Sequence, residues 1–167
     1  MKIHNDNLIF SPSDLILFLE SPFASWMEHF SLTTPETLDL KDQDDAMMLM
    51  LQDKGAEHES SVLEELKQQG LTITDIGLSS DKKAATIQAM KEGVDVIFQA
   101  CLSKGKFTGF ADFLVKVPGS SQLGDYHYEI WDTKLSKSLQ PYYTIQLCCY
   151  QEMIAAIQGR YSNDFVI

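Results

Sequence analysis

The stretch from residue 126 to residue 134 places an acid and a lysine, two residues apart, on one face that is otherwise apolar. Its sequence, Tyr-His-Tyr-Glu-Ile-Trp-Asp-Thr-Lys, is rich in aromatic and β-branched residues, which predicts a β-strand. Because strand side chains alternate between faces, Asp132 and Lys134 are expected on the same face as Tyr128 and Ile130. A buried charge is costly unless it is paired or binds a metal. The stretch therefore predicts a site where Asp132 ligates a hard cation and Lys134 stabilises charge or orients a nucleophile.

The size and composition of the chain fit one domain with an acidic surface. The chain has 167 residues, and a hydrophobic content of 44% is enough for a core. The net charge of −11 is unfavourable for a nucleic-acid binder, because neutralising phosphates needs local positive charge. The acidic excess is concentrated before residue 65, and a short basic lip around a metal cleft would be enough for binding.

The cysteines and the N-terminus indicate the compartment. Cys101, Cys148 and Cys149 form neither a disulfide framework nor a metal-binding CxxC motif, which favours reduced thiols in a cytosolic protein. The N-terminus has no apolar signal-peptide core, and no apolar run approaches the length that spans a bilayer. We therefore expect a cytoplasmic protein without a membrane segment.

Start and stop signals divide the chain into helices and strands. Serine–proline pairs at 11–12 and 21–22 predict the starts of two short helices. The elements expected after them are a helix over 44–69, strands over 71–76, 94–102, 107–117 and 126–134, helices over 80–92 and 141–158, and a strand beginning at 165. The strands after residue 94 are expected to be successive antiparallel neighbours. A chain that ends on the first apolar residues of a strand suggests a fragment of a longer protein.

Asp112 is the second carboxylate of the expected site. It lies in the middle of an apolar strand, where a pairing with a nearby lysine explains it as well as a function does. Two antiparallel strands joined by the 118–124 loop bring it close to Asp132 and Lys134. Facing carboxylates repel one another, and a divalent cation such as Mg²⁺ or Mn²⁺ removes that conflict and activates a water for phosphate chemistry. Gly109, three residues earlier, indicates a bulge or a close backbone approach.

His58 is expected on the inward face of the long helix. The residues that follow helical spacing along this face are Leu51, Gly55, His58, Val62 and Leu66. A lone histidine on such a face is more often a core residue than a ligand, but the two nearby aspartates reverse this preference. Its imidazole suits Mn²⁺ and completes a ligand set with Asp112 and Asp132, whereas Glu59 is not expected to be a direct ligand.

Four of these segments resemble, in order, the core of the PD-(D/E)xK nucleases and in particular the RecB-like branch. The matching segments are Lys54-Gly55-Ala56-Glu57-His58-Glu59, Gly109-Phe110-Ala111-Asp112, Trp131-Asp132-Thr133-Lys134 and Gln146-Leu147-Cys148-Cys149-Tyr150. The resemblance implies an α/β fold with a restriction-endonuclease-like core, a mixed sheet flanked by helices, in one domain over 1–167. It also implies a hydrolase that cleaves DNA with Mg²⁺ or Mn²⁺. Similar members occur fused to other domains, including helicases, so a helicase is a further expected partner.

The resemblance also implies roles for individual residues. The implied metal ligands and catalytic lysine are His58, Asp112, Asp132, the Thr133 carbonyl and Lys134. Gln146 and Tyr150 are expected to shape the site or contact DNA, and to face the same cleft as Lys134. Some relatives bind an iron–sulfur cluster through one early and three late cysteines. Ser21 occupies the early segment here, and three cysteines cannot supply four thiolates, so no iron–sulfur cluster is expected.

Two other functions are compatible with the same residues. The first is a non-catalytic PD-(D/E)xK-like module that binds DNA or a partner protein. It fits the acidic surface but leaves Asp112, Asp132 and Lys134 without a physical purpose. The second is a small-molecule hydrolase with the same metal site, which needs a closed pocket that nothing in the sequence indicates.

Overall fold

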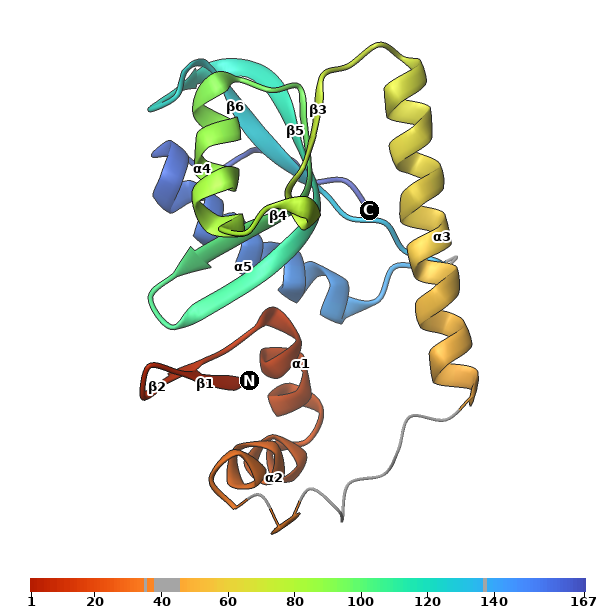
Figure 1. The fold of residues 1–167 in the computed structure, drawn as a ribbon, viewed down its shortest axis with the longest axis vertical. Coiled ribbons are helices and arrows are strands. Elements are labelled where there is room, and N and C mark those ends of the chain that lie inside the picture. The colour runs from red at the N-terminus through yellow and green to blue at the C-terminus, as the bar shows by residue number, and fades with distance from the viewer. Residues whose placement is uncertain (35, 38–45, 137) are drawn as a thin grey trace.

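A four-stranded mixed sheet forms the centre of the protein. The computed structural model describes residues 1–34, 36–37, 46–136 and 138–167. The sheet has the order β3-β4-β5-β6, and the bounds of its strands are Ile73–Asp75, Val96–Lys104, Phe107–Ser121 and Gly124–Trp131 (Figure 1). β3 runs parallel to β4, whereas β4, β5 and β6 are successive antiparallel neighbours. This confirms the predicted α/β class with a mixed sheet, and the antiparallel order of the last three strands.

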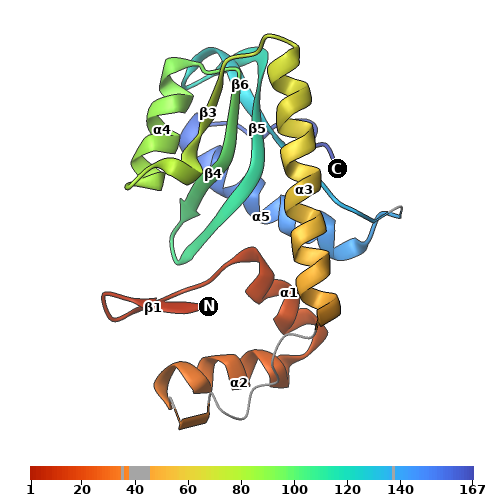
Figure 2. The same ribbon diagram turned by 45° about the vertical axis from the view of Figure 1, so that its right-hand side comes forward.

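Helices cover both faces of this sheet (Figures 1 and 2). The bounds of the large helices are Ala46–Gln68 for α3, Lys82–Glu92 for α4 and Pro141–Gln158 for α5. α4 and α5 pack in one core cluster with sheet residues such as Ile97 and Ile130. The C-terminal half of α3 contributes Leu66 to a second cluster with Val96 and Phe113, on the other face of the sheet. In the part of the chain that the structure describes, no helix is both long and apolar enough to cross a membrane.

The N-terminal segment docks on the tip of the β4–β5 hairpin. Its elements are β1 (Lys2–His4), β2 (Asn7–Ile9), α1 (Pro12–Glu20) and α2 (Pro22–Thr33). Ser11 and Ser21 cap the two helices through their side chains, which confirms both predicted helix starts. The small β1–β2 hairpin was not predicted. Its turn residues, Asn5 and Asp6, both have positive φ, which Asn and Asp tolerate better than other residues with a side chain.

β6 ends three residues earlier than predicted. Its last residue is Trp131, so Asp132 follows the strand instead of lying on it. The Asp132 N–H donates to Val166 O at 2.9 Å, but the Thr133 N–H donates to the Asp112 side chain at 2.9 Å. The chain leaves the sheet here because a carboxylate, and not a backbone carbonyl, accepts the next hydrogen bond. The alternation of faces expected for residues 126–134 therefore does not extend past Trp131.

The hairpin between β5 and β6 is longer than predicted. β5 runs to Ser121 and β6 begins at Gly124, so strand pairing occupies most of the expected 118–124 loop. The register shifts between Pro118 and Ser121. Gly119 lies inside this shift with a φ of 140°, a conformation that favours glycine.

The outer edge of β6 is covered by the C-terminal segment and by one buried side chain. Val166 N–H donates to Ile130 O at 3.0 Å, in a parallel bridge that extends the sheet by one contact. Gln158 is fully buried, and its amide accepts from the Tyr128 N–H at 2.9 Å and donates to the Tyr128 carbonyl at 3.2 Å. The Gln158 amide thus takes the place of a neighbouring strand at this edge.

We expect Gln158→Met to lower the free energy of unfolding by about 1–3 kcal/mol, because the buried Tyr128 N–H loses its acceptor while side-chain volume is kept. Gln88→Met is the matched control, since Gln88 is exposed on α4, and it should change stability by less than about 0.5 kcal/mol. Urea unfolding followed by circular dichroism measures both. Equal effects of the two substitutions would contradict the role assigned to Gln158.

Candidate functional site

Carboxylates from three elements meet beside the end of β6. Asp112 comes from the middle of β5, Asp132 from the segment after β6, and Glu59 from α3. The charge of Asp132 acts on both other carboxyls, and Asp112 also feels the charges of Glu59 and Lys134. The structure thus brings Asp112, Asp132 and Lys134 together, as expected from the strand order. It adds Glu59, which was not expected to be a direct ligand.

A local break in the sheet lies at Asp112. The ladder between β4 and β5 is interrupted where Gln99 faces Asp112, although the pairs on either side are regular. Gln99 has a φ of 54°, in the left-handed region that residues other than glycine rarely adopt. Strict alternation fails at this point, because Ala111 and Leu114 share one core cluster while Phe113 belongs to the other. Because of this break, the direction of the Asp112 side chain does not follow from the regular alternation of faces along β5.

Asp132 is a buried carboxylate without a hydrogen-bond donor. Asp132 is 2% exposed, and neither of its carboxylate oxygens accepts a hydrogen bond from the described residues. Lys134 Nζ lies 2.6 Å from Asp132 Oδ2, which makes an ion pair without hydrogen-bond alignment. A buried carboxylate is costly unless its lone pairs are satisfied. Asp132 therefore has unused capacity to bind a cation.

Burial and the negative charge of Asp132 both act to raise the pKa values of Asp112 and Glu59. Burial and then the negative charge of Asp132 raise the pKa of Asp112 to about 7, although the Thr133 N–H opposes this shift. Burial also raises the pKa of Glu59, where a hydrogen bond from Gln99 acts in the opposite direction. A divalent cation between these groups would remove both the repulsion and the burial penalty. The donor set and its electrostatics therefore suit a hard divalent metal.

Glu59, and not His58, is the residue of α3 that turns toward the aspartates. His58 is exposed, whereas Glu59 is half-buried and accepts a 2.6 Å hydrogen bond from Gln99 Nε2. The expectation that His58 lies on the inward face is therefore wrong. The half-buried Leu63 explains the difference, because it shifts the centre of the inward face and leaves His58 about a quarter of a turn away.

Lys134 pairs with the buried Asp132 and also borders an open cleft. The cleft has a volume of about 630 Å³ and separates α3 from the segment that follows β6. Its lining residues are Leu51, Gln52, Gly55, Ala56, Glu59, Thr133, Lys134, Leu135, Ser136 and Tyr143. Lys134 Nζ also lies 5.4 Å from the centre of the Tyr143 ring. A ligand in the cleft would reach Lys134 and Glu59 first, with both aspartates beneath them.

Tyr150 and Gln146 hold β5 and do not line this cleft. Tyr150 is buried, and its hydroxyl donates to the Phe110 carbonyl at 2.7 Å, two residues before Asp112. Gln146 Nε2 in turn lies 3.4 Å from the Tyr150 hydroxyl. A Cβ at Gly109 would lie 2.8 Å from Tyr150 Cε1, so Gly109 marks a close approach, as predicted. Tyr143 occupies the place in the cleft that was expected for Gln146 and Tyr150.

Burial raises the pKa of Tyr150 to about 12, and the charges of Asp132 and Asp112 act in the same direction, although the Gln146 hydrogen bond opposes them. Tyr150 is therefore neutral at physiological pH, and its hydroxyl keeps the proton that it donates to Phe110. Thr133 supports Asp112 from the other side, because its N–H and its hydroxyl both donate to Asp112 Oδ2, at 2.9 and 3.3 Å. These contacts fix the backbone on either side of the aspartate pair.

No family model, curated protein or solved structure matches the chain. Within residues 1–34, 36–37, 46–136 and 138–167, no three His, Cys, Asp or Glu side chains lie close enough together to hold a metal ion in this conformation. Asp112, Asp132 and Glu59 interact through their charges, and the Glu59 carboxylate accepts a hydrogen bond from Gln99 in this structure. A bound metal ion would explain why the oxygens of the buried Asp132 have no hydrogen-bond donor in the described part of the chain.

Two residues of the site were missed by sequence reasoning. Glu59 was set aside, and the available signal was Leu63, which widens the inward face of α3 on the side of Glu59. Gln99 was not considered at all, because nothing in a residue type other than glycine or asparagine signals a left-handed backbone. Its role depends on a tertiary contact across 40 residues of sequence.

The raised pKa of Asp112 predicts an unusual pH dependence of the metal-free protein. Between pH 4 and 7 the unfolded chain has lost the Asp112 proton, whereas the folded chain retains it until about pH 7. The unfolded state then binds fewer protons, so the free energy of unfolding should fall as pH rises across this window. Asp112→Asn should flatten this dependence in urea titrations with a chelator present.

Asp95→Asn is the control for this measurement. A hydrogen bond from Lys116 is the main cause that lowers the pKa of Asp95 to about 2, so its contribution is complete above about pH 4 and is lost as pH falls toward 2. Asp95→Asn should therefore leave the decline between pH 4 and 7 in place. An unchanged decline in Asp112→Asn would show that Asp112 is ionised in the folded apo protein.

Proposed function

We propose that this protein is a metal-dependent nuclease with a PD-(D/E)xK-like core, and that it hydrolyses phosphodiester bonds in DNA. The observation that carries the proposal is the buried Asp132, whose oxygens lack hydrogen-bond donors beside a second aspartate of raised pKa. Lys134 lies 2.6 Å from Asp132 and borders an open cleft. A carboxylate pair suits a hard divalent cation, and an adjacent lysine suits the charge that develops on a phosphate during metal-assisted hydrolysis.

Asp112 and Asp132 are the proposed metal ligands, with Mg²⁺ or Mn²⁺ as the ion and the Thr133 carbonyl as a further oxygen. When bound, such an ion supplies a nucleophilic water and stabilises charge on the phosphate. Glu59 is the proposed third acidic group, either as a direct ligand or through a water. In this structure the Glu59 carboxylate accepts a hydrogen bond from Gln99 Nε2.

Lys134 is the proposed catalytic residue. The Lys134 side chain is one-fifth exposed, while the side chain of its partner Asp132 is buried, so the lysine connects the buried carboxylate with the cleft. A positive charge in this position neutralises negative charge that develops on the reacting phosphate, and it orients the attacking water. Tyr143, on α5, places its aromatic ring next to the Lys134 ammonium, in a cation–π contact.

The proposed substrate is DNA, and the proposed compartment is the cytoplasm. The cleft is open to solvent and bordered by a lysine, as a polymeric substrate needs. All three cysteines are free, which suits a reducing environment. The alternative is a module that binds DNA or a partner, such as a helicase, without cleaving it. That alternative gives no reason to bury Asp132 without hydrogen-bond donors.

We expect Lys134→Ala to lower the rate of DNA cleavage by about 10²–10³ in the presence of Mg²⁺ or Mn²⁺. Because Lys134 is the ion-pair partner of a buried carboxylate, the variant is also expected to be less stable without metal. Folding is therefore verified by circular dichroism in the same metal-containing buffer. Lys54→Ala, at an exposed lysine of α3, is the control. Wild-type rates in a folded Lys134→Ala protein would refute the catalytic role.

The contributions of Glu59 and His58 are separated by metal binding alone. Glu59→Gln keeps the hydrogen bond to Gln99 possible but removes the charge, and we expect it to weaken Mn²⁺ binding about 10-fold or more. His58→Ala, at an exposed position, is expected to change the affinity less. Isothermal titration calorimetry without DNA measures both. A larger loss with His58→Ala would restore the sequence-based assignment of His58 as a ligand.

A further inference from the structure

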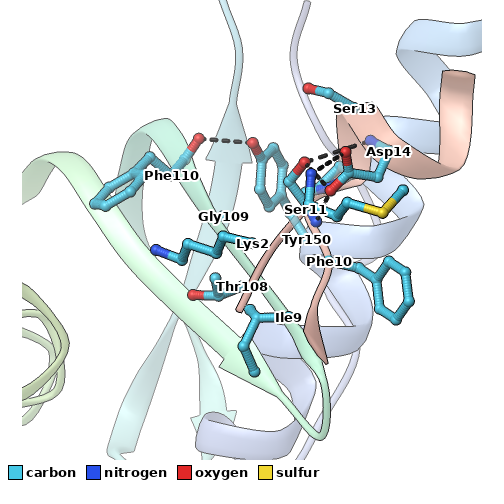
Figure 3. A pocket seen from close by; sticks show the side chains of 12 residues that line it. Lys2, Ile9, Phe10, Ser11, Ser13, Asp14, Thr108, Gly109, Phe110 and Tyr150 are labelled. Atoms are coloured by element: carbon cyan, nitrogen blue, oxygen red, sulfur yellow. Dashed lines mark hydrogen bonds and ion pairs between the residues drawn. The ribbon is translucent and has the colours of Figure 1, made fainter. Parts of the chain in front are cut away.

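Lys82 and Lys2 lie beside an exposed phenylalanine two residues before Asp112, and a third lysine, Lys83, follows Lys82 at the start of α4. We call Lys2, Lys82, Lys83 and Phe110 the lysine–phenylalanine patch. Lys82 Nζ lies 5.4 Å from the centre of the Phe110 ring, and Phe110 is 42% exposed. Lys2 and Phe110 line the same cavity of about 380 Å³, and Figure 3 shows the Lys2 side chain extending along β5 toward Phe110.

The three lysines come from separate parts of the chain. Lys2 lies on β1, whereas Lys82 and Lys83 begin α4. Their charges meet at Cys101, the cross-strand partner of Phe110, where burial raises the pKa of the thiol and the charges of all three lysines oppose that shift. The convergence is therefore a product of the fold and not of a basic run in the sequence.

None of the three lysines forms an ion pair with another residue in the described part of the chain. The lysine side chains that do form such pairs there are Lys67, Lys104, Lys116 and Lys134. In a chain with a net charge of −11, three lysines without ion-pair partners among the described residues are a local source of unpaired positive charge, although Asp14, paired with the N-terminus, lines the same cavity as Lys2. Their positive charge is available to an anionic ligand.

The chemistry of the patch favours a single strand over a duplex. An exposed aromatic ring offers a stacking surface for a base, and adjacent lysines neutralise phosphates. In a duplex the bases are already stacked, so Phe110 would contribute nothing. The Tyr150 hydroxyl fixes the backbone of Phe110 through its 2.7 Å hydrogen bond, so the ring and Asp112 are held in a constant relation on β5. The same strand thus carries a stacking surface and a site carboxylate, about 7 Å apart along the backbone.

We propose that the lysine–phenylalanine patch binds single-stranded DNA, with a base stacked on Phe110 and the flanking phosphates on the lysines. Its purpose, which rests on the proposed function, is to lead the strand to the aspartates. The patch supplies the positive charge that the composition of the chain otherwise lacks.

Fluorescence anisotropy with a labelled oligothymidylate in a chelating buffer tests the binding without cleavage. Phe110→Ala is expected to weaken binding about fivefold or more, and Phe110→Trp to keep it, because stacking needs a ring. Lys82→Ala should weaken binding and make the salt dependence shallower by about 0.7 in log–log slope. Lys91→Ala, at the other end of α4, and Phe23→Ala, at an exposed phenylalanine of α2, are the controls and should bind as the wild type does.

Unchanged binding in both Phe110→Ala and Lys82→Ala would overturn the proposal, and so would equal losses in the two controls. A loss with Phe110→Ala that is as large on duplex DNA, or tighter binding of an oligouridylate RNA, would also overturn it. A separate cleavage assay with Mn²⁺ distinguishes the two hypotheses. Patch-dependent binding without cleavage supports the patch and rejects the nuclease, whereas cleavage that ignores the patch variants does the reverse.

Discussion

The burial of the Asp132 carboxylate is the constraint on which the rest of this structure depends. A negative charge at 2% exposure, with no hydrogen-bond donor for its oxygens in the described chain, has to be compensated by its surroundings. Lys134 provides part of the compensation at 2.6 Å, and Asp112 provides more by favouring its protonated form. Because the pKa of Asp112 is about 7, its carboxyl exchanges between the protonated and the ionised form near neutral pH. A bound cation would favour the ionised form.

The fold holds the backbone of both aspartates in place, whereas the N-terminal half of α3, on the other side of the cleft, is largely exposed. Tyr150 ties the strand of Asp112 to α5, and the C-terminal segment continues β6 beyond Trp131. α3 differs, since only its C-terminal half is packed on the sheet, while Met47 and its neighbours up to Leu51 are largely exposed. The aspartates thus lie on the sheet side of the cleft, and Glu59 lies on the helix side, within the half of α3 that packs on the sheet.

Local patterns in the sequence predicted most of the fold but only part of the site. Serine–proline starts and strand composition gave the element order, because capping and turn chemistry act over a few residues. Asp112, Asp132 and Lys134 followed from two adjacent strands. The end of β6 was not predictable, because it depends on a side chain 21 residues away accepting the Thr133 N–H. The patch was equally hidden, since its lysines meet only after β1, α4 and β5 have packed together.

At Gln99, the stability of the fold and the arrangement of the acidic site favour different residues. Its left-handed backbone costs about 1–3 kcal/mol in an L-residue with a side chain, a cost that glycine does not incur. The retained side chain holds Glu59 at 2.6 Å, so the strain is coupled to the acidic group at the cleft. Selection for thermal resistance alone would favour glycine at this position and release Glu59 from its tether. A laboratory search for hardier variants should therefore regard position 99 as one where gains in melting temperature come at the expense of the site.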